Sequence, residues 1–394
     1  MQVYSNSEIP TLQVVENNNQ PETANQVFSK SVNAWALDLY QDLAKVRNLQ
    51  DKNLYFSHLI YWLPFLCFML GLQKNCRGSW RKPCMGELKL DSWHYNFKVW
   101  SEGISARSQQ FKDGKPAYHF QQVQMLATHV STPLTVKAVG SLYQYKCENK
   151  TFSNPSEVGP FINSRVEGVT EGIIKDLGNQ EDLTSDLILL MASAALFKGQ
   201  WEYPFDKEEN STEIFKNSDG SKVKGEMMNQ GVDNLKMSYD STDNYKISIL
   251  ELPFQGQISL LLMKPDSWMG IKPKEQLQKF MIIENVQALL NSYDDRFHTR
   301  SALTVGIPKL DFKEKVDVLE ELGRTSLAQA IKDADFNGSL VNCGAEAKTP
   351  KLVSEVHFTM DEEGAKVAGA SFSPTYCESC DPAFKLMDLL GWPS

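Results

Sequence analysis

The sequence lacks a long uninterrupted apolar run, and this absence argues against a membrane-spanning helix. The longest apolar stretch, Leu59–Leu72, is interrupted by Pro64 and is shorter than the ~20 residues that a helix needs to cross a bilayer. The first residues, MQVYSNSEIPTLQ, do not show the basic-then-apolar order of a secretory signal. We therefore expect no membrane partner.

Basic runs are also missing from the chain. The 40 Lys and Arg residues are outnumbered by 49 Asp and Glu residues, which gives a net charge of −9. Without a dense basic patch the chain has no electrostatic footprint for nucleic acid, so no nucleic-acid partner is expected. The 42% hydrophobic and 23% charged content is ordinary for a globular protein. A length of 394 residues allows one large domain or two medium ones.

Neither the cysteines nor the histidines form a recognisable chemical site. Seven Cys at irregular spacing exclude a disulfide framework but not one or two bridges. Cys377 and Cys380 form a single C-x-x-C, which we interpret as two loop cysteines because no second pair exists. The motifs G-x-S-x-G, H-E-x-x-H and G-x-x-x-x-G-K are absent. We therefore expect no enzyme, no metal site and no cofactor.

Helix signals dominate the first half of the chain. Residues 1–24 are rich in Asn, Gln and Glu and are predicted to form a flexible extension. Apolar residues recur every three or four positions over Val27–Val46, Glu157–Leu177 and Lys313–Leu322. This spacing predicts three amphipathic helices.

Strand signals dominate the second half. Two apolar runs in Ile247–Lys264, separated by Gln255-Gly256-Gln257, predict a hairpin. Leu187–Phe197 is a buried apolar run, and Ser301–Phe312 alternates between apolar and polar residues. Helices that mainly precede strands favour an α+β fold with largely antiparallel sheets. No repeat or Pro/Ser-rich linker is visible, so residues 25–394 are predicted to form a single domain.

An ordered series of short segments carries the most specific information. Leu196–Phe205 (LFKGQWEYPF) is close to the pattern F-K-G-x-W-x-x-P-F, and other segments follow in order: 224–230 (KGEMMNQ), 250–263 (LELPFQGQISLLLM), 307–312 (IPKLDF), 322–323 (LG), 334–336 (ADF), 353–357 (VSEVH) and 361–365 (DEEGA). Upstream, Phe161-Ile162-Asn163, Thr170 and 174–177 (IKDL) fit a helix across a sheet. Over about residues 25–372, this order resembles the serpin family.

The resemblance implies a fold of about eight to nine helices around three largely antiparallel sheets, with an exposed reactive loop. It also implies a suicide inhibitor, whose loop is cut by a target serine protease and then enters the main sheet as a new strand. Trp201 and His357 would border the region where that sheet opens. The alternative is a non-inhibitory serpin that carries a ligand, serves as a store or is simply cut as a substrate.

Residues 362–369 are expected to form the hinge of this loop. Alternate side chains of a strand face opposite sides, so one parity after the hinge must be small or apolar. The positions on this parity are free of charge and bulk, whereas Lys366 and Phe372 fall on the other one. The expected hinge and insertion residues are Glu362, Glu363, Gly364, Ala365, Val367 and Gly369, with Ser371 continuing the small parity.

The usual loop length of the family places the reactive bond near Glu378-Ser379. Between Ser371 and Asp381 there is no Lys or Arg, which argues against a trypsin-like target. Glu378 would suit an acid-preferring protease, whereas Tyr376 or Phe372 would suit a chymotrypsin-like one.

Several features depart from the family. Only 394 − 378 = 16 residues follow the expected bond, so the two strands that end the family's fold are expected to be truncated. The family's polar centre beneath the main sheet is replaced by Phe56-Ser57-His58 and Ser193-Ala194. Residues 58–84 fit the family poorly, and a shifted reading frame would restore a helical apolar stripe there. We therefore hypothesise a compensated frameshift in this segment.

Asn149, Asn210 and Asn337 fit the N-glycosylation pattern. A secreted, extracellular glycoprotein is expected from the family, with a cytoplasmic protein as the alternative. We expect a monomer whose partner is a target serine protease.

Overall fold

The computed structural model describes residues 3–5, 24–46, 111–130, 147–324, 347–348 and 351–377, apart from short gaps at 113–114, 117, 179, 217–220, 234, 243, 257, 267–269 and 301–302, and isolated positions between 99 and 108. The segment 58–84 of the frameshift hypothesis lies outside the described residues. So do Asn337, the expected bond Glu378-Ser379 and the C-terminal residues that follow it.

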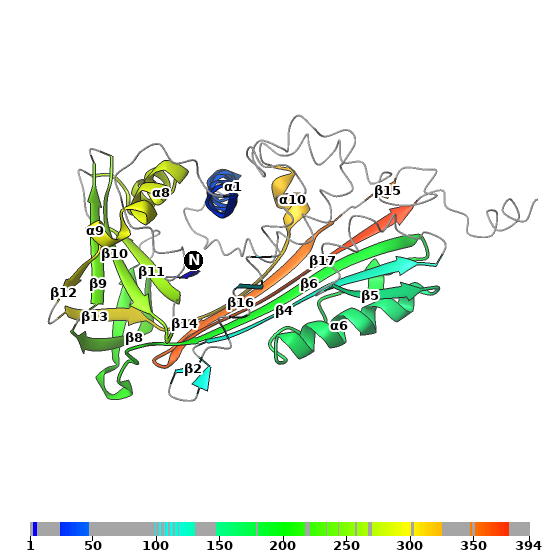
Figure 1. The fold of residues 1–394 in the computed structure, drawn as a ribbon, viewed down its shortest axis with the longest axis horizontal. Coiled ribbons are helices and arrows are strands. Elements are labelled where there is room, and N and C mark those ends of the chain that lie inside the picture. Colours follow the sequence, from blue (N-terminus) through cyan, green and yellow to red (C-terminus); the bar gives the residue numbers. More distant parts are fainter. Residues whose placement is uncertain are drawn as a thin grey trace, which may run out of the picture.

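A long main sheet forms the centre of the fold (Figure 1). Its strands are ordered β14-β16-β17-β6-β4-β5, and neighbours are antiparallel except for the parallel pair β4 and β5. The short strand β15 pairs with the end of β17. The bounds are β4 Tyr118–His129, β5 Cys147–Phe152, β6 Leu187–Gln200, β14 Leu310–Asp317, β15 Ala347–Lys348, β16 Val353–Met360 and β17 Gly364–Cys377.

Two smaller sheets lie beyond one end of the main sheet (Figure 1). One has the order β1-β11-β10-β9-β12 and the other β13-β8-β7; β2 and β3 form a separate pair. The bounds are β1 Val3–Ser5, β2 Phe111–Lys112, β3 Lys115–Pro116, β7 Ser211–Lys216, β8 Lys222–Val232, β9 Leu235–Ser241, β10 Lys246–Pro253, β11 Ile258–Pro265, β12 His298–Arg300 and β13 Leu303–Pro308.

These sheets confirm the α+β class and the predicted hairpin, which is β10 and β11. The predicted extension at residues 1–24 contains β1, whose three residues pair with Ile258–Leu260 of β11. Val3–Ser5 are therefore placed in a sheet rather than in a flexible tail, because β11 offers them an unpaired edge. The prediction of a single domain stays a prediction, as does the number of eight to nine helices.

The helices of the described residues partly match the prediction. Their bounds are α1 Ala24–Val46, α6 Val158–Val169, α7 Pro273–Phe280, α8 Ile283–Asn291, α9 Tyr293–Arg296 and α10 Val318–Leu322, with single 3-10 turns at Pro155–Glu157, Gln180–Asp182 and Lys207–Glu209. The helix predicted over 27–46 is confirmed by α1.

Two predicted helices are too long. The one predicted to reach Leu177 ends at Val169, because Glu171 and Gly172 have positive φ angles of 51° and 75°. In the other, the residues before Val318 continue strand β14, and the helix begins only where the Asp317 side chain accepts hydrogen bonds from the next backbone N–H groups. Alternating polar and apolar residues that also fit a helical spacing made these boundaries ambiguous.

Strand β17 is buried by apolar clusters on both sides of the main sheet. Helix α6 lies against one face of the sheet (Figure 1), where Ile162 and Val166 belong to the same cluster as Ala368 and Phe372. The cluster that includes Ala365 is separate and contains aromatic residues such as Trp201, Phe205 and Phe254. The residues expected to form an exposed reactive loop are therefore an internal strand. This corrects the prediction, and the physical reason is that their small side chains fit between β16 and β6.

Gly364 lies where β17 enters the sheet, and its backbone approaches that of β6. A Cβ at this position would lie 1.9 Å from the carbonyl oxygen of Gly199. We predict that Gly364→Ala destabilises this inserted fold by at least about 1–3 kcal/mol, because a backbone atom cannot yield as a side chain can. Thermal unfolding of the two proteins measures the loss. Gly231→Ala is the control, because a Cβ there would meet nothing within 4 Å; equal effects of both substitutions would contradict the prediction.

Candidate functional site: the hinge and the inserted strand

A tight turn connects β16 to β17. The backbone N–H of Asp361 donates to the carbonyl oxygen of Gly364 at 3.0 Å. The Asp361 carboxylate accepts from the N–H groups of Glu363 at 2.9 Å and Gly364 at 3.1 Å. These bonds satisfy the donors of the turn, so the chain reverses direction within residues 361–364.

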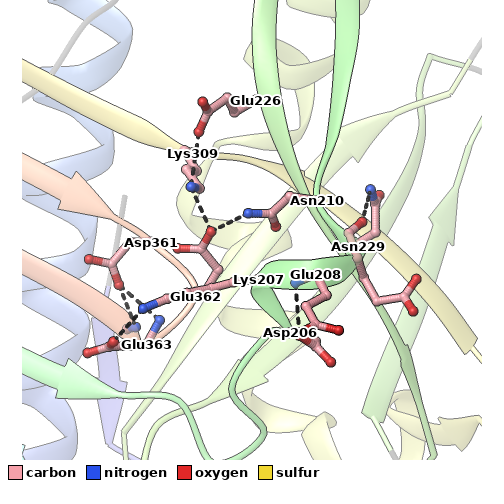
Figure 2. A network of polar contacts seen from close by, with 12 residues as sticks. Asp206, Lys207, Glu208, Asn210, Glu226, Asn229, Lys309, Asp361, Glu362 and Glu363 are labelled. Carbon is pink, nitrogen blue, oxygen red and sulfur yellow. Dashed lines mark hydrogen bonds and ion pairs between the residues drawn. The ribbon is translucent and has the colours of Figure 1, made fainter.

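Glu362 is held in the turn by a set of contacts that we call the hinge clamp: Glu362, Lys309 and Asn210 (Figure 2). The Glu362 side chain is only 5% exposed and forms an ion pair with Lys309 at 2.6 Å. The side-chain amide of Asn210 donates to the same carboxylate oxygen. Lys309 in turn pairs with Glu226 at 3.0 Å. The clamp thus joins the hinge to the β7, β8 and β13 sheet.

Trp201 fixes the other side of the turn. It is 1% exposed and stacks on Phe254 with ring centroids 4.5 Å apart. Its backbone N–H donates to the backbone carbonyl oxygen of Glu363, and its indole N–H donates to the backbone carbonyl oxygen of Asp361, each at 2.9 Å. The sequence placed Trp201 near the opening of the sheet, and here it holds the turn. Glu363 itself is exposed and pairs with Lys207 at 2.9 Å.

The charges of the hinge change the pKa of its acids. Burial raises the pKa of Glu362, but the hydrogen bonds from Lys309 and Asn210 outweigh burial and lower it to about 2. The hydrogen bond from Lys207 lowers the pKa of Glu363. The hydrogen bonds to Glu362 and Glu226 raise the pKa of Lys309. Glu362 is therefore charged throughout the physiological range.

The predicted hinge residues of the small parity lie along β17. Ala365 is 3% exposed, Gly369 is buried, and Val367 is half-buried against the cluster of Trp201. The other parity is buried too: Ala368, Ala370 and Phe372 are at most 1% exposed. Sequence reasoning set a size limit for only one parity. The helix predicted at 157–177 has an apolar face, which indicated that a helix would cover the face of the sheet on which the other parity lies.

Hydroxyl groups lie at the centre of the inserted strand. The side-chain oxygens of Ser193 on β6 and Ser371 on β17 are 3.0 Å apart and buried. The hydroxyl of Ser354 on β16 donates to the carbonyl oxygen of Ala370 at 3.4 Å. Ser193, one of the residues at which the sequence departs from the family's polar centre, therefore contacts β17 through its hydroxyl group.

The far end of β17 is fixed by Tyr376. Its hydroxyl donates to the backbone carbonyl of Asp182 at 2.7 Å, and the Asp182 carboxylate is ion-paired with Lys351. Burial, together with the carboxylates of Asp182 and Asp186, raises the pKa of Tyr376 to about 12. This phenol was proposed from the sequence only as a specificity residue.

A row of basic side chains crosses the sheet near the hinge. Lys366 lies directly opposite Lys198 on β6, and Lys198 lies opposite His119 on β4. Glu171, which follows α6, forms an ion pair with Lys198, and its other carboxylate oxygen lies 3.6 Å from Nε2 of His119. Elsewhere on the sheet, His357 pairs with Asp311 at 2.8 Å, so it bridges β16 and β14 rather than touching the turn.

The remaining predicted site residues are separate. Asn149 is exposed on β5, whereas Asn210 is half-buried in the hinge clamp. Within the described residues, no group of three or more His, Cys, Asp or Glu side chains is arranged to hold a metal ion. A search of the described helices for one both long and apolar enough to cross a membrane found none.

A family model and several known proteins match this chain. The family model described as serpin (serine protease inhibitor) matches residues 30–386. Alpha-1-antiproteinase S of Cavia porcellus is 30% identical over 234 residues, which make up 59% of this chain and 54% of that protein. The chain thus matches about half the length of this relative.

Solved structures are similar over more of the chain. Ovalbumin from emu (Dromaius novaehollandiae) has a TM-score of 0.73 at 20% identity, covering 90% of this chain and 91% of that one. Cleaved Serpin 42Da has a TM-score of 0.75 at 17% identity, with the same coverage. These likenesses establish the fold.

We predict that the Glu362 contribution to stability disappears at acidic pH. Its pKa is lower in the folded state, about 2, than the ordinary 4.5, so the contribution is complete above about pH 5 and falls as the pH approaches 2. Unfolding of Glu362→Gln should show a loss of about 1–3 kcal/mol at neutral pH that shrinks over this range. Glu363→Gln, at the exposed neighbour, should change stability much less, because solvent screens its ion pair. A pH-independent loss for Glu362→Gln would contradict the prediction.

The Tyr376 contribution should disappear at alkaline pH instead. Its pKa is raised from 10.0 to about 12 on folding, so stability is complete below pH 10 and falls as the pH rises through 12. We expect Tyr376→Phe to cost about 1 kcal/mol at neutral pH through the lost hydrogen bond. The difference from the wild type, followed by denaturant unfolding, should narrow above about pH 10. A difference that stays constant to pH 12 would show that the phenol is not buried as described.

Proposed function

The chain belongs to the serpin family, and we propose that it inhibits a serine protease by inserting its cleaved reactive loop into the main sheet. The observation that carries this proposal is the fit of Gly364–Cys377 as a strand between β16 and β6. Both edges of this strand are paired, and from Ala368 to Thr375 every residue is buried. A substrate loop without an inhibitory role has no need of such a fit.

The proposed mechanism follows from the geometry of β17. Cleavage at its C-terminal end would free the loop from the segment that follows, while the hinge clamp holds the N-terminal end. Zipping 14 residues into the sheet at about 3.4 Å per residue carries the attached acyl group roughly 48 Å. A protease bound through its active-site serine would be pulled along this distance against the end of the sheet, which would distort its catalytic groups.

Insertion is favourable because β16 and β6 gain a partner. Without β17, the facing edges of both strands would have unpaired N–H and C=O groups next to each other, and the gap would leave a void against α6. Insertion pairs these groups and buries Ala368, Ala370 and Phe372. The structure describes the chain with β17 in the sheet. We propose a second state of the uncut chain in which these residues lie outside the sheet, and we infer that this state stores the free energy that cleavage releases.

We keep Glu378-Ser379 as the proposed reactive bond, because Gly364–Cys377 form one continuous strand. Cleavage after Phe372 or Tyr376 would instead separate residues that here form one continuous strand. We therefore propose an acid-preferring target protease first and a chymotrypsin-like one second. The protein would meet this target as a secreted monomer, with the cytoplasm as the alternative compartment.

A non-inhibitory serpin is the second candidate, and one observation favours it. Insertion places Lys366 directly opposite Lys198, and like charges at directly opposed positions of a sheet are unfavourable. Slower insertion gives the protease time to complete hydrolysis and leave. In that case the protein would be cleaved as a substrate, and its role would be to carry or store.

Incubation with a glutamate-specific and a chymotrypsin-like serine protease separates these candidates. For an inhibitor we expect an SDS-resistant covalent complex, with one protease trapped for every one or two inhibitor molecules. Clean cleavage near residues 376–379 without a complex would contradict inhibition and favour the second candidate.

Two matched loop variants test whether insertion causes the trapping. Ala365→Arg puts a charge at a position that is 3% exposed, so it should abolish the covalent complex and leave only cleaved chain. Lys366→Arg introduces the same residue at the exposed neighbour and should keep the stoichiometry within about twofold, because it preserves the charge. Unchanged trapping by Ala365→Arg would exclude the insertion mechanism.

A further inference from the structure

Asn210 has two uses that involve the same nitrogen atom, which keeps only one of its two hydrogens when a glycan is attached. It begins Asn210-Ser211-Thr212, which fits the N-glycosylation pattern. The nitrogen that would receive the glycan, Nδ2, is the one that donates to Glu362 in the hinge clamp (Figure 2). We propose that Asn210 is a glycosylation-sensitive latch: a glycan at this position and the Asn210–Glu362 contact exclude each other.

The orientation of the Asn210 amide is determined by its surroundings. A carboxylate only accepts hydrogen bonds, so the NH₂ group must face Glu362 and the oxygen must face away. That oxygen, Oδ1, is buried and has no hydrogen-bond partner in the described residues. The amide therefore gives up one possible hydrogen bond to keep the contact with Glu362, and turning it over would place two oxygens together.

The residues on both sides of Asn210 are held by hydrogen bonds. The Asn229 amide donates to the carbonyl oxygen of Glu209 and to the hydroxyl of Ser211, both at 3.0 Å. Thr212 is already paired with Glu226 in the β7–β8 ladder. Asn210 thus lies between two anchored residues, so a side chain that carries a glycan can leave Glu362 only by rotating about its own bonds.

On the side of Glu362, the surroundings of Nδ2 are crowded. Glu362 is 5% exposed and is also bound by Lys309 at 2.6 Å, so the carboxylate has little room to retreat. A sugar attached to Nδ2 before the chain folds would separate Asn210 from Glu362. Lys309 would then be the only remaining side-chain partner of Glu362 in the clamp, and the entry of β17 into the sheet would be less firmly fixed.

The exposed sequon at Asn149 provides an internal comparison. Asn149 lies on β5 at the far edge of the main sheet and is exposed. A glycan there meets no part of the hinge. Its presence should therefore leave the stability of the sheet unchanged, and removing it separates a general effect of glycans from the specific effect at Asn210.

The test compares chains that differ only in the glycan. The full chain, behind a cleavable secretory leader, is produced in eukaryotic cells, and mass spectrometry of its peptides measures occupancy at Asn149 and Asn210. Thr212→Ala keeps Asn210 but removes the acceptor pattern, and Thr151→Ala does the same for Asn149. The wild-type and Thr212→Ala chains are also made in the bacterial cytoplasm, where neither is glycosylated.

We expect Asn210 to be occupied in the secreted wild-type chain. Its melting midpoint should lie about 3 °C or more below that of secreted Thr212→Ala, as expected for a lost hydrogen bond to a charged group. The two bacterial chains should melt together, and Thr151→Ala should melt like the wild type. An empty Asn210 in the secreted chain, or an occupied Asn210 with an unchanged midpoint, would overturn the proposal. Neither result depends on whether the protein traps a protease.

Discussion

The pairing of β17 with β16 on one edge and with β6 on the other is the interaction on which the rest of the structure depends. It closes the main sheet, gives α6 a continuous surface to pack on, and sets the register of the hinge. The register is decisive because a shift of one residue would exchange the two faces of the strand. Lys366 would then turn into the sheet's covered interior, and Phe372 would lose the apolar cluster beneath α6.

The hinge makes this register unique. Asp361 satisfies the turn's own backbone donors, Trp201 holds two of its carbonyl groups, and Glu362 connects it to a different sheet. A buried ion pair contributes little net free energy, but it is costly to break from one side. The clamp therefore specifies the register more than it stabilises the fold, because Glu362 would lose its partners Lys309 and Asn210 in any other register.

Sequence reasoning could predict the sheets and the position of the hinge, because period-two patterns and the ordered segments around Leu196–Phe205 and 361–365 are local. It failed where tertiary structure decides between local alternatives. Gly172 was a local signal for the end of α6, but the positive φ of Glu171 is one that its residue type does not favour. The state of the loop was also predicted wrongly as exposed, since an insertable strand and an exposed loop have the same small residues. Asn210 gave only a glycosylation pattern, and its contact with Glu362 arises from residues 152 positions apart.

Glu171 shows how the fold compensates for the charge that insertion brings. A non-glycine residue with φ of 51° is strained by about 1 kcal/mol or more, and the helix could have ended without it. The strain places a carboxylate where Lys198 and His119 already lie and where Lys366 arrives. The Lys198 hydrogen bond lowers the pKa of Glu171, and Lys366 acts in the same direction. Lys366 therefore lies near a fixed negative charge as well as a positive one, so Glu171 offsets part of the repulsion between Lys366 and Lys198 in the sheet.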